Sequence, residues 1–127
     1  MNLHQLAIKT AEQGLDTLIT NYQRGWLDGG CFTFAWAFCR AMPEQCRAYH
    51  VSRIREVPDH GVVFLPAINR FLDADGLQTK EQLLYKMRHV ELTYVQDVWA
   101  FEDIQNYPIY HDISLQLIAY IKSKNLA

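Results

Sequence analysis

The chain contains 127 residues with a formal net charge of −2, and half of its residues are hydrophobic. This length and composition are typical of one folded domain with a packed core, spanning residues 1–127. Twelve basic residues against fourteen acidic ones give no general attraction to phosphate backbones, so we expect no nucleic-acid partner. No run approaches the roughly 20 apolar residues that span a bilayer, and the N-terminus lacks a secretory signal. We therefore expect no membrane association and a cytoplasmic location, with export by a specialised secretion system left open.

The N-terminal part is predicted to be helical on both sides of a glycine-rich turn. Residues 2–21 place apolar side chains at three- and four-residue steps, which predicts an amphipathic helix with Asn2 as its N-cap. A turn over residues 24–30 precedes a strongly apolar helix, expected from Cys31 to about Met42 and ended by Pro43.

Three strand-like runs follow, at residues 48–56, 60–65 and 70–73. The short gaps between them favour an antiparallel meander over parallel strands with crossovers. Thr79 and Gln82 have the spacing of a capping box, which predicts a helix that reaches about Val90. Residues 92–100 are a possible fourth strand, and residues 112–124 form a predicted terminal helix. Helices segregated around an antiparallel meander are typical of an α+β domain.

Cys31 is the candidate nucleophile, because it follows two glycines at the expected start of a helix. Backbone N–H groups and the partial positive charge at such a position favour a thiolate. His60, at the start of the most apolar strand, is the candidate general base and acid. Asp73 is the preferred residue to orient the imidazole, with Asp75 as the alternative.

Hairpin geometry connects His60 with these carboxylates. A four-residue loop over 66–69 pairs Leu65 with Arg70, and this register places Asp75 directly opposite His60 and Asp73 diagonally on the same face. The geometry does not select between the two aspartates. A loop one residue longer or shorter moves both aspartates to the opposite face.

Two other interpretations of the cysteines and His50 are a disulfide set and a metal site. Three cysteines cannot form a closed disulfide set, and Cys39 is expected to pack in the core. Cys46 and His50 have the spacing of half a zinc site, but the chain has no matching second half. We therefore expect no metal and no cofactor. Cys31 as an ordinary buried side chain is the structural alternative to a nucleophile.

The order of these residues resembles the papain-like cysteine peptidase superfamily, and most of all its small bacterial NlpC-type branch. Gly-Gly-Cys at 29–31, Asp-His-Gly-Val-Val at 59–63 and Asp-Ala-Asp-Gly at 73–76 also resemble short uncharacterised bacterial and phage proteins. The resemblance covers residues 26–87. It implies a papain-like core, with the cysteine helix packed on a small antiparallel sheet, and a triad formed by Cys31, His60 and Asp73.

The resemblance implies a cysteine-dependent hydrolase for an amide or isopeptide bond, acting on a peptide, isopeptide or other acyl substrate. The chain departs from the pattern in three places: Phe32 follows the cysteine where serine is usual, an aspartate replaces the common third histidine, and papain's oxyanion glutamine has no counterpart. Two alternatives stay open: an inactive papain-like module that binds a partner protein, and a cysteine acyltransferase. The sequence does not indicate an oligomeric state.

Overall fold

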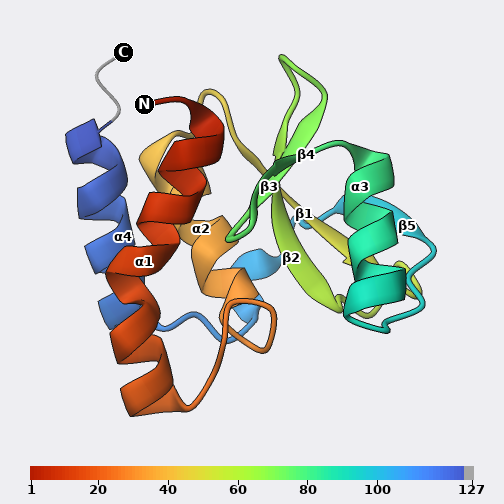
Figure 1. Cartoon of the computed structure of the whole chain (residues 1–127), viewed down its shortest axis with the longest axis horizontal. Coiled ribbons are helices and arrows are strands. Elements are labelled where there is room, and N and C mark those ends of the chain that lie inside the picture. Colours follow the sequence, from red (N-terminus) through yellow and green to blue (C-terminus); the bar gives the residue numbers. More distant parts are fainter. Residues whose placement is uncertain (125–127) are drawn as a thin grey trace.

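Five antiparallel strands form one sheet in the order β4-β3-β2-β1-β5, with helices on both of its faces (Figure 1). This computed structural model describes residues 1–124. The strands are β1 Arg47–Ser52, β2 His60–Leu65, β3 Arg70–Asp73, β4 Gly76–Gln78 and β5 Asp97–Ala100. Each of β1 to β3 pairs with the next strand along the chain, which confirms the predicted meander and the α+β class, and β5 pairs with β1.

Four α-helices surround the sheet. The long helices α1 Leu3–Tyr22, α2 Cys31–Ala41 and α4 His111–Lys124 lie together on one side, and α3 Lys80–Tyr85 lies on the other (Figure 1). A π-helical turn, η1 Lys86–Val90, continues α3, and a short 3-10 turn, η2 Ile104–Asn106, precedes α4. Side-chain caps at Asn2 and Thr79 begin α1 and α3 as predicted.

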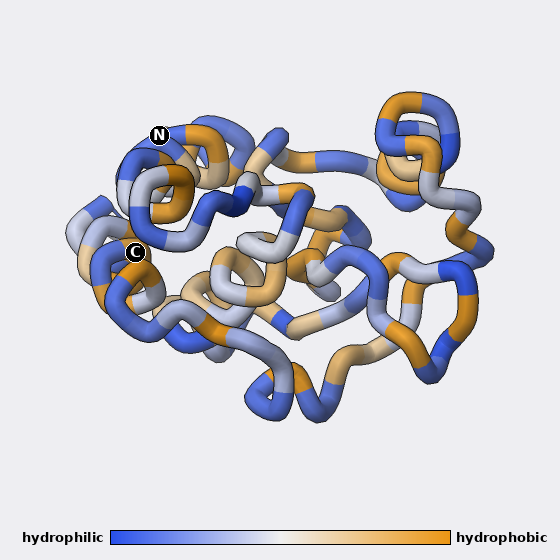
Figure 2. The backbone as a smooth tube through the Cα atoms, turned by 90° about the horizontal axis from the view of Figure 1, so that it is seen from below, coloured by the Kyte–Doolittle hydropathy of each residue, from blue (hydrophilic) through white to orange (hydrophobic). Residues whose placement is uncertain are grey.

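The sheet separates two hydrophobic cores. The larger core joins the inward faces of α1, α2 and α4 to Val63, Leu65 and Leu72 of the sheet. The smaller core places Leu83 and Met87 of the α3–η1 segment against the opposite face. Figure 2 shows hydrophobic and hydrophilic residues alternating along the helices and loops at the outside of the molecule. Within residues 1–124, no helix has both the length and the apolar character that a membrane crossing needs.

The first strand is shorter than predicted and ends at Ser52 rather than at residue 56. After Ser52, side chains replace the neighbouring strand as hydrogen-bond partners of the backbone. The carboxylate of Asp59 accepts from the N–H of Arg53 at 2.8 Å. The hydroxyl of Ser52 in turn accepts from the N–H of Asp59 at 2.8 Å. Residues that were predicted to extend the ladder therefore form a closed loop.

Two further predictions need correction in the C-terminal half. Only residues 97–100 of the expected strand over 92–100 are extended, because the guanidinium group of Arg88 donates to the carbonyls of Val95 and Gln96. Strand β4 was not predicted, because glycine after aspartate at 75–76 is typical of a turn. Gly76 has a φ of 109°, which glycine tolerates, and it pairs with Asp73 at the start of β4.

Candidate active site

Cys31 is the first residue of α2 and lies at the junction between this helix and β2. The turn before it is closed by the N–H of Gly30, which donates to the carbonyl of Gly25 at 3.0 Å. A Cβ on Gly30 would lie 2.8 Å from that same carbonyl oxygen, so the turn requires a glycine here. The Sγ atom of Cys31 accepts a hydrogen bond from the backbone N–H of Gly61 at 3.4 Å. The thiol is thus held directly beside the residue that follows His60.

His60 and Asp73 meet across the β2–β3 hairpin. Leu65 pairs with Arg70 around a four-residue loop, which confirms the predicted register. The diagonal arrangement places Nε2 of His60 3.0 Å from Oδ2 of Asp73. Because Asp73 is ionised, Nε2 carries the proton and donates it, which leaves Nδ1 for the other side of the ring. Nδ1 is buried and has no hydrogen-bond partner of ordinary geometry among residues 1–124.

The carboxylate of Asp73 accepts from four donors. Oδ2 receives Nε2–H of His60 and the ammonium group of Lys86. Oδ1 receives Nε2–H of Gln78 at 2.8 Å and the backbone N–H of Asp75 at 3.0 Å. The alternative orienting residue, Asp75, is turned outward, and its carboxylate pairs with Lys86 at 3.1 Å. Of the two aspartates, Asp73 is therefore the one in contact with the imidazole.

Burial and charge act in opposite directions at this pair. Burial lowers the pKa of His60, but its hydrogen bond to Asp73, together with the bonding and charge of the nearby Cys31 sulfur, outweighs burial and raises that pKa to about 9. Burial likewise raises the pKa of Asp73, while His60 and Lys86 outweigh it and lower that pKa to about 2. The carboxylate is thus charged, and the imidazole is favoured as an imidazolium, at neutral pH.

The two other cysteines have a different environment. Burial raises the pKa values of Cys39 and Cys46 to about 12, so both are thiols at neutral pH. Nδ1 of His50 is 2.7 Å from the hydroxyl of Ser52, and burial lowers the pKa of this histidine. No group of three potential metal ligands occurs within residues 1–124.

Two contacts of Asp73 were not anticipated from the sequence. Gln78 was missed together with β4, the strand that carries it. Lys86 had a visible signal, because it is three residues after Leu83 and one before Met87, two apolar positions of the predicted helix. A lysine on the apolar face of a helix indicates a buried acidic partner.

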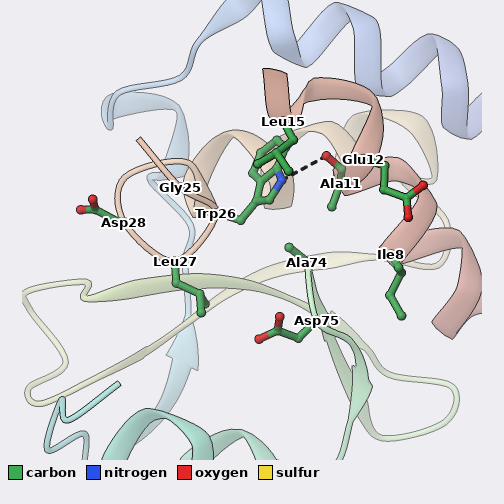
Figure 3. Close-up of a pocket in the computed structure, with 10 residues that line it drawn as sticks. All are labelled: Ile8, Ala11, Glu12, Leu15, Gly25, Trp26, Leu27, Asp28, Ala74 and Asp75. Carbon is green, nitrogen blue, oxygen red and sulfur yellow. Dashed lines mark hydrogen bonds between the residues drawn. The ribbon is translucent and has the colours of Figure 1, made fainter. Parts of the chain in front are cut away.

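A pocket of about 470 Å³ lies between α1, the turn before Cys31 and the β3–β4 turn (Figure 3). Its wall includes the indole ring of Trp26, whose Nε1–H donates to the carbonyl of Ala11 at 3.1 Å. Asp75 contributes a carboxylate from the β3–β4 turn. Neither Cys31 nor His60 lines this pocket.

The arrangement contains the parts that thiol-based acyl transfer needs: a sulfur, an imidazole beside it and a carboxylate that fixes the ring. Comparison of the chain with models of protein families, with curated proteins and with solved structures finds no significant match. Any assignment of function therefore depends on the residues and geometry described above.

Proposed function

We propose that this protein is a papain-like, cysteine-dependent acyl hydrolase that cleaves an amide or isopeptide bond. The observation that carries the proposal is the convergence of three residues from three elements. The sulfur of Cys31 contacts the N–H next to His60, while His60 binds Asp73 through Nε2 and keeps Nδ1 unpaired. A buried imidazole nitrogen without a partner beside a thiol is suited to proton exchange with that thiol.

In the first half of the proposed reaction, the thiol proton resides on Nδ1 of His60, which makes the ring an imidazolium, and the Cys31 thiolate attacks the acyl carbon. The carbonyl oxygen becomes an oxyanion, for which the backbone N–H of Cys31 at the first turn of α2 is one donor. The tetrahedral intermediate collapses as His60 returns the proton to the leaving amine, and a thioester remains on the sulfur. Asp73 holds the imidazolium during both transfers.

In the second half, His60 removes a proton from water as the water oxygen attacks the thioester carbon. Collapse of this second intermediate releases a carboxylic acid, and the sulfur leaves as a thiolate that regains its proton from His60. A cysteine acyltransferase would share the thioester and differ only in replacing water with another acceptor.

Burial of the triad favours a second candidate function. Cys31, His60 and Asp73 are 3%, 1% and 2% exposed, so a substrate reaches the sulfur only if the covering residues move. A site that never opens would make the protein an inactive papain-like module that binds a partner protein. The two candidates therefore differ in whether the sulfur of the folded protein can be reached.

Alkylation of the native protein with iodoacetamide at about pH 7 tests the proposal. Peptide mass mapping reports on all three cysteines at once, and Cys39 and Cys46 serve as internal controls because their pKa values are about 12. We expect Cys31 to react first, and His60→Ala to slow its alkylation by about tenfold or more. Alkylation of Cys31 only after unfolding, or at the same rate in the His60→Ala variant, would refute the hydrolase and favour the binding module.

A further inference from the structure

Lys86 is a charged residue in contact with the triad to which the proposed reaction assigns no role. Its ammonium group contacts Oδ2 of Asp73, the same oxygen that binds His60, and lies 3.1 Å from Oδ2 of Asp75. The Lys86 side chain is only 14% exposed. Ion pairs on the protein surface contribute little, whereas a cation this enclosed strongly affects the charge of its partners.

The backbone around Lys86 is unusual and determines where the ammonium group lies. η1 begins at Lys86, and the carbonyl of Lys86 accepts from the N–H of Glu91 at 3.0 Å, five residues later. Leu83 and Met87, on either side of Lys86 in the chain, are both buried against the sheet. The apolar anchoring of this segment therefore brings Lys86 to the sheet face that carries His60 and Asp73. Single π-helical turns are frequent at functional sites.

We propose that Lys86 is a positioning residue of this site, which shares Oδ2 of Asp73 with His60 and thereby limits how strongly the carboxylate holds the imidazolium. The inference rests on the proposed function, in which His60 must both take a proton from Cys31 and release it to a leaving group. A carboxylate that paired with His60 alone would favour proton uptake from Cys31 and oppose proton release to the leaving group. The ion pair with Lys86 weakens the attraction between Asp73 and the imidazolium.

The surroundings of His60 limit the groups that can produce such an effect. On β1, the residue paired with His60 is Val51, which carries no charge. The outer partner of Lys86 is Asp75, on the β3–β4 turn. Among the described residues, the charged or titratable groups that act on His60 directly are Cys31 on α2 and Asp73 on β3, and Lys86 on η1 contacts the carboxylate of Asp73.

The test measures the pKa and tautomer of His60 by nitrogen-15 NMR across pH in the intact protein, together with the pH profile of Cys31 alkylation. Lys86→Met removes the charge, Lys86→Gln removes the charge but retains a donor, and Lys86→Arg retains both. Lys80→Met is the matched control, because Lys80 pairs with Asp97 at 2.7 Å in the same segment, with both side chains nearly half exposed. Urea unfolding shows which variants are folded, and Lys86→Gln replaces Lys86→Met if the latter is not.

We expect the uncharged variants to raise the pKa of His60 by about one unit, and to move the alkylation profile with it. Lys86→Arg and Lys80→Met should leave both unchanged. The inference is overturned if His60 titrates identically in the uncharged variants, or if Lys86→Arg or Lys80→Met moves it equally. The NMR titration does not depend on activity. An unreactive Cys31 would therefore refute the hydrolase while the pKa of His60 still reports on Lys86.

Discussion

Replacing Asp73 with asparagine should destabilise the protein in a way that depends on pH. The substitution keeps the size of the side chain but removes the charge that pairs with His60 and Lys86. Both oxygens of the Asp73 carboxylate accept hydrogen bonds, whereas an amide has only one oxygen. In either orientation, the NH₂ group of the asparagine therefore faces donors that it cannot bind. The lost hydrogen bonds and the lost ion pair with Lys86 reduce stability at both pH 6 and pH 9.5, and the lost ion pair with His60 reduces it only where His60 is protonated.

The pH-dependent part can be calculated from His60. Folding raises the pKa of His60 from 6.5 to about 9, which at about 1.4 kcal/mol per unit corresponds to about 3 kcal/mol. A raised pKa stabilises the folded state fully below the unfolded value, and this stabilisation is lost as pH rises through the folded value. The lowered pKa of Asp73 describes the same pair and is not added. Cys31 contributes part of this shift and burial of His60 opposes it, so about 3 kcal/mol is the order of magnitude of the pH-dependent effect.

Urea unfolding of the wild type and of Asp73→Asn at about pH 6 and pH 9.5 measures this quantity. The difference in unfolding free energy between the two proteins should be larger at pH 6, by about 3 kcal/mol. Asp97→Asn is the control, because Asp97 forms an exposed pair with Lys80 and should cost less than about 1 kcal/mol at both pH values. If Asp73→Asn costs the same free energy at both pH values, His60 is not held as an imidazolium by this carboxylate.

Two glycine positions provide further predictions. A Cβ on Gly61 would lie 2.9 Å from Cδ1 of Phe32, so Gly61→Ala should push the first turn of α2 from β2. We expect it to cost about 1–3 kcal/mol in urea unfolding and to change the alkylation rate of Cys31; no effect on either would show that this contact is loose. Gly76→Ala places a Cβ against the ring of His4 at a positive φ, and should cost more than about 1 kcal/mol. The double variant with His4→Ala should recover part of the lost unfolding free energy. If His4→Ala leaves the cost of Gly76→Ala unchanged, the whole cost comes from the backbone conformation.

The positions of Cys31, His60 and Asp73 in the fold were predictable from the sequence because each lies near the end of a strongly patterned element. The apolar run at 60–65 has one plausible register with 70–73 once the loop has four residues, and this register determines the face that Asp73 occupies. The two glycines before residue 31 in the same way indicated where α2 begins. Local pattern and hairpin geometry were sufficient at these positions because few alternatives satisfy both.

The environment of Asp73 was less accessible to sequence reasoning, because it depends on contacts between elements. Gln78 reaches Asp73 through a three-residue strand, too short to produce a recognisable alternation. Lys86 reaches it because the helix changes to π geometry, which residue preferences do not indicate.

The cost of the buried charges is itself an argument for a function at this site. A buried ion pair contributes less to stability than well-packed apolar residues of similar volume in many proteins. Here an almost fully buried carboxylate and imidazole and a partly buried ammonium group meet at one oxygen, and Nδ1 of His60 has no partner of ordinary hydrogen-bond geometry among the described residues. Packing alone gives no reason for an unpaired nitrogen beside a thiol, because it carries the cost of desolvation without the benefit of a bond. Proton exchange between His60 and Cys31 uses that free nitrogen, so the feature least favourable for stability is the one that the proposed chemistry requires.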